Sequence, residues 1–398
     1  MDSLGFAGAE VGEKQPGEFR ILFLGDSTPL GIGLDNAEES FVRQIEALLK
    51  TRLPEKSISV INASVAGYTS WQCRKQLELI GTRLKPDMVM TYFGNNDPSI
   101  NGYLNDRKLY EQTRSVSEVN RLLAHSYIYQ LLKGVVLSMK SKAAASSPLV
   151  ARVTVDEARD NIAAIKQWCD SSGCALMVCT VATPDFWPPG IQFKVFSGGM
   201  DSQGRLIMAD ELQGTLLDQW AICFDTTLLP GQTDQWTAHV YESSYRDRRS
   251  PAESAAECRR LLERTPSSAR LWNNLGVALW QQGEVADSMF ALAMALDSLS
   301  AIAAYNAGVA ALHRNPVEAE ALLKRAKELD NYSLRIKSSY NELYRQFCQD
   351  NGLPLADVEQ LFAGLPEIEY FVDHCHPTLA GHELIAGELV ELVVKHIR

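Results

Sequence analysis

The strongest constraint on this fold is a pair of short motifs at opposite ends of the chain. Gly-Asp-Ser at 25–27 ends an apolar run, and Asp-His-Cys-His-Pro at 373–377 precedes the last amphipathic segment. A serine just past a strand and an aspartate three residues before a histidine are side chains that nucleophilic catalysis combines. The chain must therefore fold so that residues separated by most of its 398 positions meet.

Apolar runs alternate with amphipathic segments along the first half of the chain. The predicted elements are strands at 19–24, 58–61, 88–93 and 175–181 and helices at 41–49, 77–84 and 155–169, followed near the C-terminus by a helix at 338–350, a strand at 353–358 and a helix at 384–397. This alternation predicts an α/β fold with a parallel sheet that helices cover on both faces.

Three residues closely follow the ends of predicted strands: Ser27, Gly67 and Asn96. Functional sites of parallel sheets lie beyond the C-terminal ends of the strands. We therefore expect these three residues to gather on one rim of the sheet.

From about residue 250 the pattern is purely helical and repeats itself. The run Trp-x-x-Leu-Gly-x-x-Leu at 272–279 is echoed by Ala-x-x-Ala-Gly-x-x-Ala at 304–311. This resembles the tetratricopeptide repeat, a helix–turn–helix unit of about 34 residues, over roughly two and a half units. A generic pair of helical hairpins is the alternative. So short an array buries little apolar surface alone, so deletion of 250–332 is expected to destabilise the protein.

These patterns together predict a discontinuous organisation. The expected parts are a flexible N-terminus at 1–16, the first part of the α/β domain at 17–184, a connector at 185–249, an inserted all-α region of helical repeats at 250–332 and the second part of the α/β domain at 333–398.

The two terminal motifs supply the candidate catalytic residues. A serine hydroxyl such as that of Ser27 becomes nucleophilic when a base takes its proton, and His376 is the candidate base. Asp373 would fix the tautomer of His376 and stabilise its charged form. The backbone N–H groups of Ser27 and Gly67 and the amide of Asn96 are candidate donors to an oxyanion. Each motif taken alone is also typical of an ordinary turn or helix cap.

Several neighbouring residues leave alternatives open. Asn95 competes with Asn96, and His374 competes with His376. The histidines, the cysteine and the aspartate of 373–376 could also be read as a metal site, but no fourth ligand cluster is visible, so no metal is expected. His382 is expected to be structural. The substrate cleft is expected to involve Asp26, Thr28, Asn95, Phe186 and Trp187. The aromatic stripe at 126–132 could line this cleft, act as a lid or be an ordinary packing helix.

The four motifs, in this order, resemble those of the SGNH (GDSL-like) hydrolase superfamily. The nucleophile block is Gly-Asp-Ser at 25–27, the glycine block is Gly67, the asparagine block is Gly-x-Asn-Asp at 94–97 and the last block is Asp-x-x-His-Pro at 373–377. Thr28 stands where the first block usually has leucine. The resemblance covers roughly 17–184 and 333–398. It implies a three-layer α/β/α sandwich with a five-stranded parallel sheet, Ser27 as nucleophile, Gly67 and Asn96 as oxyanion donors, and His376 and Asp373 as the rest of a triad.

The composition of the chain bears on its binding partners, its location and the state of its cysteines. A net charge of −11 argues against nucleic-acid binding, because phosphate contacts need clustered lysine and arginine. The start of the chain lacks the charged and apolar stretches of a signal peptide, and no run is long enough to span a bilayer, which favours the cytoplasm. The eight cysteines form no Cys-x-x-Cys pair, so buried free thiols are expected.

The resulting hypothesis is a serine esterase without metal or organic cofactor. It would act through an acyl-enzyme on a short-chain ester or an O-acylated carbohydrate. An O-acyltransferase with the same triad is the first alternative. The second is an interaction protein whose repeats bind a protein or peptide partner, with the hydrolase part as a scaffold.

Overall fold

The computed structural model of this chain describes residues 11–102, 104–112, 150–185, 187, 189, 250–312, 314–330, 334–365 and 367–397. The chain divides into two compact units, one made of Met1–Thr183 with Leu334–Arg398 and the other of Pro184–Ser333. The stripe predicted at 126–132 and most of the connector predicted at 185–249 lie outside the described residues.

A five-stranded, fully parallel sheet forms the centre of the first unit. Its strands are β1 (Glu18–Gly25), β2 (Ser57–Asn62), β3 (Met88–Tyr92), β6 (Ala175–Cys179) and β7 (Leu355–Ala356), in the order β2-β1-β3-β6-β7. The predicted five-stranded parallel sheet is therefore confirmed.

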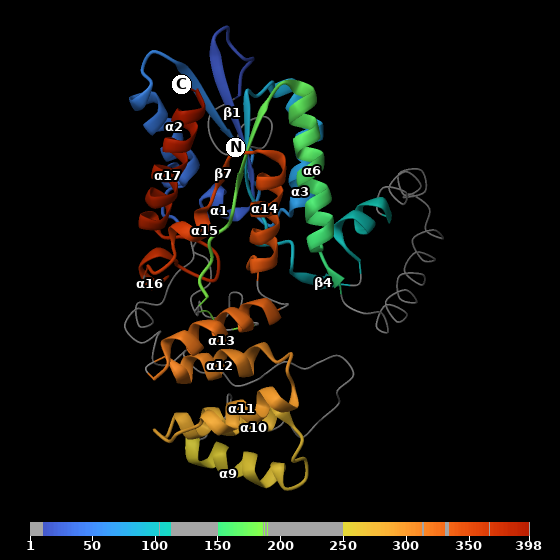
Figure 1. Cartoon of the computed structure of the whole chain (residues 1–398), viewed down its shortest axis with the longest axis vertical. Helices are drawn as coiled ribbons and strands as arrows, with labels where there is room; N and C mark the ends of the chain where they lie inside the picture. The colour runs from blue at the N-terminus through green and yellow to red at the C-terminus, as the bar shows by residue number, and fades with distance from the viewer. Residues whose placement is uncertain are drawn as a thin grey trace, which may run out of the picture. The chain divides into compact units, whose positions relative to one another are not determined.

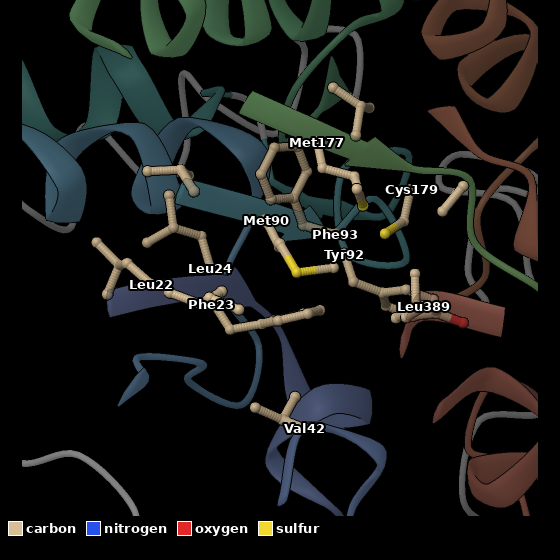
Figure 2. Close-up of a cluster of buried hydrophobic side chains, with 14 of the residues drawn as sticks. Leu22, Phe23, Leu24, Val42, Met90, Tyr92, Phe93, Met177, Cys179 and Leu389 are labelled. Atoms are coloured by element: carbon tan, nitrogen blue, oxygen red, sulfur yellow. The ribbon is translucent and has the colours of Figure 1, made fainter. Parts of the chain in front are cut away.

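The central strands are apolar on both faces because both faces are covered. The residues of 21–24 are wholly buried. Strand register pairs Phe23 with Met90 and Met90 with Met177, so these side chains form one row across the sheet (Figure 2). Phe23 meets Phe41 of the covering helix edge to face, with ring centroids 5.4 Å apart.

Two groups of helices complete the three-layer sandwich that the resemblance implied. Helices α2 (Phe41–Arg52) and α17 (Leu379–Ile397) pack together on one face of the sheet (Figure 1). The other face carries α3 (Ser70–Leu84), α6 (Val155–Ser172) and α14 (Ser338–Asn351), as Figure 1 shows.

A second, two-stranded sheet was not predicted. Strands β4 (Ile100–Gly102) and β5 (Val150–Ala151) pair antiparallel. Both are too short to carry a periodic pattern of apolar residues, which is the signal on which sequence reasoning relies. Their pairing brings the residues after β5 back beside the loop that follows β3.

Helix ends in this unit follow local capping signals. At the start of α6, Thr154 and Glu157 form a reciprocal capping box, and Gly173 ends the helix in the left-handed region at φ 64°. At the start of α3, Thr69 and Gln72 form a second capping box. These caps fix where each helix begins relative to the strand before it.

The second unit is all helical. Its described helices are α9 (Pro251–Leu262), α10 (Ala269–Trp280), α11 (Asp287–Leu296), α12 (Ala301–Ala311) and α13 (Pro316–Leu329). Helix α10 packs on α11 and α12 packs on α13. Gly276 lets α10 lie close to α11, because a Cβ there would lie 2.6 Å from the Phe290 ring. Gly308 likewise lets α12 lie close to α13, because a Cβ there would lie 2.9 Å from Leu323.

Within the described ranges, no helix combines the length and apolar character needed to cross a membrane. The described cysteines are all buried and free, as expected for thiols inside apolar runs.

Glycine-to-alanine changes on two helices of the first unit should have opposite effects on stability. A Cβ at Gly81 would come within 2.4 Å of Trp168, whereas one at the exposed Gly387 meets nothing within 4 Å. Gly387→Ala should raise the free energy of unfolding by about 0.5–1 kcal/mol through helix propensity. Gly81→Ala should lower it, because overpacking costs about 1–3 kcal/mol. Urea denaturation of both variants tests this, and equal shifts would contradict the packing of α3 on α6.

Candidate active site

Ser27 stands at the sharp turn between β1 and the short helix α1 (Ser27–Leu30). The turn is so tight that a Cβ at Gly25 would lie 2.2 Å from Pro29 Cγ and 2.8 Å from the Tyr92 carbonyl oxygen. Only glycine fits there. The Asp26 carboxylate caps α1 by accepting the Thr28 N–H at 3.0 Å. The Ser27 hydroxyl is therefore presented at the C-terminal end of a central strand.

His376 joins this serine to Asp373. The distance from His376 Nε2 to Ser27 Oγ is 2.8 Å, and that from His376 Nδ1 to Asp373 Oδ2 is 2.7 Å. A carboxylate only accepts, so we assign the proton of the neutral ring to Nδ1, which leaves Nε2 to accept from the serine hydroxyl. The structure thus brings together the three side chains that the terminal motifs offered.

Asp373 is held rigidly as an anion. Its Oδ1 accepts the backbone N–H groups of Cys375 at 2.9 Å and His376 at 2.7 Å. Burial alone would raise the pKa of Asp373, but the charge and hydrogen bond of His376 and these N–H groups hold that pKa well below its ordinary value.

The environment of His376 favours its charged form. Burial opposes charge on the ring, but the attraction and hydrogen bond of Asp373, with a further contribution from the Asp26 carboxylate, raise the pKa of His376 above its ordinary value. A raised pKa makes His376 a stronger base toward the serine proton.

Gly67 occupies a tight turn after β2. The Tyr68 N–H donates to the Val65 carbonyl at 3.1 Å, and Gly67 has φ +79°, the geometry of a type II turn with glycine at its third position. Among the described residues, the Gly67 N–H donates to no other group, so it can serve as an oxyanion donor.

Asn96 is tied to the same turn. Its Nδ2 donates to the Tyr68 carbonyl at 3.0 Å, and its side chain is buried. An amide nitrogen has two N–H groups, so one is left for a ligand. The glycine and asparagine motifs are therefore hydrogen-bonded to each other in the rim region where the sequence predicted they would gather.

Three residues expected near the cleft are buried instead of exposed at its rim: Asp26, Thr28 and Asn95. The Thr28 hydroxyl donates to the Cys375 carbonyl at 3.3 Å. Asn95 Oδ1 accepts the Ile336 N–H at 3.1 Å. These side chains connect the nucleophile turn, the asparagine block and the C-terminal motif, so they brace the site from inside. Burial raises the pKa of Asp26 to about 6.

The other two expected cleft residues cannot be joined to this site. Phe186 lies outside the described residues, and Trp187 is half-buried in the second unit.

Asp373, His374 and Cys375 form the one group among the described residues whose donor atoms are close enough to hold a metal ion. The chemistry of this set does not suit a metal. Burial, followed by the charge of Asp373, raises the pKa of the Cys375 thiol well above its ordinary value, whereas metal binding needs a thiolate. Asp373 is already committed to two N–H groups and to His376. The Nδ1 atom of His374 lies 3.7 Å from Asp373 Oδ1, beyond hydrogen-bonding distance.

His382 links the two helices on one face of the sheet. Its Nδ1 accepts the Phe41 N–H at 3.1 Å, at the first turn of α2, and its ring stacks on Phe41 at 5.5 Å. Burial, with the nearby charge of His376, lowers the pKa of His382 to about 3. It is a neutral structural residue, as the sequence suggested.

Sequence reasoning missed two charged residues that surround the turn at Gly67. Arg152 donates to the Gly67 carbonyl at 2.9 Å and pairs with Asp106 through two hydrogen bonds. Neither residue lies in a motif, and they meet through the small β4–β5 sheet, so no local signal could have identified them.

A buried carboxylate in the asparagine block generates a pH prediction. Burial raises the pKa of Asp97 to about 7, above its ordinary unfolded value, and its Oδ2 accepts no hydrogen bond from any described residue. Folding therefore favours protonated Asp97, and its ionisation destabilises the protein as pH rises toward 7. Asp97→Asn should keep the bond from the Ser70 N–H and remove this dependence.

The free energy of unfolding of the wild type, relative to Asp97→Asn, should fall by an amount on the order of a few kcal/mol between about pH 4, where the unfolded carboxyl ionises, and about pH 7, where the folded one does. Urea titrations of both proteins across this range measure it. A difference that stays constant with pH would show that Asp97 ionises normally in the folded protein.

Comparisons with known proteins found matches to two families. Residues 23–192 match the GDSL-like lipase/acylhydrolase family, and residues 243–298 match a tetratricopeptide repeat family. No curated protein matches the chain.

Solved structures also resemble this chain. A GDSL-like lipase from Parabacteroides merdae is 12% identical with a TM-score of 0.39, covering 96% of this chain and 98% of its own. A catalytic mutant of Axe2, an acetylxylan esterase from Geobacillus stearothermophilus, is 12% identical with a TM-score of 0.37, covering 94% of each chain. TesA is 20% identical with a TM-score of 0.25 over 42% of this chain, which spans 62% of the length of TesA.

These matches confirm the resemblance predicted from the motifs: residues 23–192 are similar to the GDSL-like lipase/acylhydrolase family and residues 243–298 to tetratricopeptide repeats.

Proposed function

We propose that this protein is a serine esterase that cleaves a small O-acyl ester through an acyl-enzyme. The observation that carries the proposal is the continuous hydrogen-bonded line from Asp373 through His376 to Ser27, with distances of 2.7 and 2.8 Å. A buried anion, an oriented imidazole and a hydroxyl in this order are what an activated serine requires.

Acylation would begin when His376 Nε2 takes the hydroxyl proton of Ser27. The serine oxygen attacks the ester carbonyl carbon, and the carbonyl oxygen becomes an oxyanion. His376 then gives the proton to the leaving alcohol oxygen as the carbon–oxygen bond breaks, which leaves the acyl group on Ser27. Water repeats the sequence, with His376 accepting its proton and returning a proton to Ser27.

The oxyanion would be bound by the Ser27 N–H, the Gly67 N–H and the Asn96 amide. Donors held in place before the reaction stabilise developing charge without the cost of reorganisation. The hydrogen bond from Asn96 to the Tyr68 carbonyl supports this proposal, because it connects Asn96 to the residue next to Gly67.

We propose that the helical repeats bind a protein or peptide partner. The matched tetratricopeptide family and the paired helices of the second unit support a binding role for that region.

We propose that the substrate is an ester of a short acyl group with a carbohydrate or another small alcohol. Turnover of p-nitrophenyl esters of increasing chain length and of acetylated sugars tests the acyl preference. Faster transfer to an added alcohol than to water would identify an acyltransferase instead.

Ser27→Ala should abolish both labelling by a fluorophosphonate probe and turnover of p-nitrophenyl acetate, with a loss of roughly 10⁶ in kcat. The matched control is Ser40→Ala, because Ser40 is another buried serine at a helix start and its hydroxyl forms no hydrogen bond within the described part of the chain. This control should label like the wild type. A folded wild type that does not label would refute the esterase proposal.

The pH dependence of activity should reflect the raised pKa of His376. The base must be neutral, so activity falls as pH drops through the pKa, and the acid limb of kcat/KM should lie above the ordinary value of about 6.5. Asp373→Asn should move this limb to lower pH and reduce kcat by about 10⁴. An unmoved limb in the variant would mean that Asp373 does not act on His376.

A further inference from the structure

Arg152 is a charged residue outside all four motifs, yet it contacts the turn that carries Gly67. Its Nη1 donates to the Gly67 carbonyl oxygen at 2.9 Å. Its Nη2 donates at 3.0 Å to Gln72 Oε1, an oxygen that also accepts the Thr69 N–H at the start of α3. One guanidinium therefore holds both the turn and the helix that follows it.

The guanidinium is fixed by a carboxylate. Arg152 Nε and Nη2 donate to the two oxygens of Asp106 at 3.1 and 2.9 Å, and both side chains are mostly buried, with 12% and 11% exposed. Asp106 Oδ2 also accepts the Thr69 hydroxyl at 2.8 Å. A two-pronged pair of this kind sets the plane and direction of the arginine far more strictly than a single contact.

The backbone around Arg152 is attached to the asparagine block. The Arg152 N–H donates to the Ser99 carbonyl and the Val153 N–H to the Asp97 carbonyl, both at 2.9 Å. The side chain thus reaches the glycine block while its own backbone is bonded to the loop that carries Asn96. Arg152 is a physical link between the two segments that supply the oxyanion donors.

We propose that Arg152 is a positioning residue that sets the orientation of the oxyanion donors at Gly67 and Asn96. Glycine has no side chain to restrict its backbone, so the direction of the Gly67 N–H depends on what holds the peptides on either side. Arg152 holds the carbonyl of Gly67, and Asn96 holds that of Tyr68. Without the guanidinium, the turn can rotate its peptide planes and the donors lose alignment.

This inference rests on the proposed esterase function, and the experiment separates the two. Arg152→Gln, Arg152→Lys and Asp106→Asn are compared with the wild type for the rate of fluorophosphonate labelling and for kcat and KM on p-nitrophenyl acetate. Removal of one oxyanion donor costs about 10²–10³ in kcat. Arg152→Gln should therefore lower kcat and the labelling rate by roughly 10- to 100-fold.

Three further readouts distinguish positioning from loss of stability. KM and the acid limb of the pH profile should not change, because the side-chain hydrogen bonds of Arg152 go to Gly67, Gln72 and Asp106 and not to His376. Arg152→Lys and Asp106→Asn should give intermediate rates, since each keeps a cation near Gly67 but loses the two-pronged geometry.

The matched control is Arg345→Gln. Arg345 pairs in the same two-pronged way with Asp357 at 2.8 Å and also meets Glu359, but it touches none of the motifs. It should lose stability and keep its labelling rate.

Each outcome has one meaning. An unlabelled wild type overturns the esterase proposal itself. A labelled wild type with equal kcat and labelling rate in Arg152→Gln overturns the positioning role. If Arg152→Gln fails to fold, Arg152→Lys and Asp106→Asn decide: wild-type rates in both folded variants overturn the role, and intermediate rates support it. Equal losses in Arg345→Gln would show that the effect is loss of stability and would also overturn it.

Discussion

The hydrogen bond between His376 and Ser27 joins the two ends of the chain, and the rest of the first unit serves to hold its partners in place. Ser27 is fixed by the tight turn at Gly25, and His376 is fixed by Asp373 and its two accepted N–H groups. The Thr28 hydroxyl also bonds to the Cys375 carbonyl, so the two turns are connected beside the histidine as well as through it. The alignment of Asp373, His376 and Ser27 therefore does not depend on one contact alone.

Burial raises the pKa of every buried carboxylate near the triad, but the outcome differs between them. For Asp373, the charge and hydrogen bond of His376 outweigh burial, so its pKa falls. For Asp26 and Asp97, hydrogen bonds and nearby charges offset burial only in part, so their pKa values rise to about 6 and 7. The same low-polarity interior that makes Asp373 an effective anion near His376 makes the other two costly to ionise. The protein tolerates this cost where the carboxylate caps a helix, as both Asp26 and Asp97 do.

What the sequence could predict was local. Short runs rich in apolar residues predicted the strands, and motifs with glycine, serine, asparagine and histidine predicted the site. The structure added contacts between segments with no shared pattern. Arg152 and Asp106 meet only because β4 and β5, strands of three and two residues, pair with each other. Thr28 stands where leucine is usual, but nothing in the sequence indicates that its hydroxyl bonds to the Cys375 carbonyl. The tertiary fold determines which of these side chains meet, and the spacing of residues in the sequence does not show it.

The long insertion between β6 and β7 leaves the sheet intact because the returning chain is anchored at once. The Ile336 N–H bonds to Asn95, and the Tyr340 hydroxyl donates to the Val153 carbonyl at 2.6 Å. The side chain of Asn341 forms two hydrogen bonds of 2.9 Å with the backbone N–H and carbonyl of Val181, which lies just after the end of β6. Loop-closure entropy rises only slowly with length. A few hydrogen bonds where the chain re-enters the first unit are therefore enough to position β7 in the sheet. The position of β7 in turn helps to position His376, which follows it in the chain.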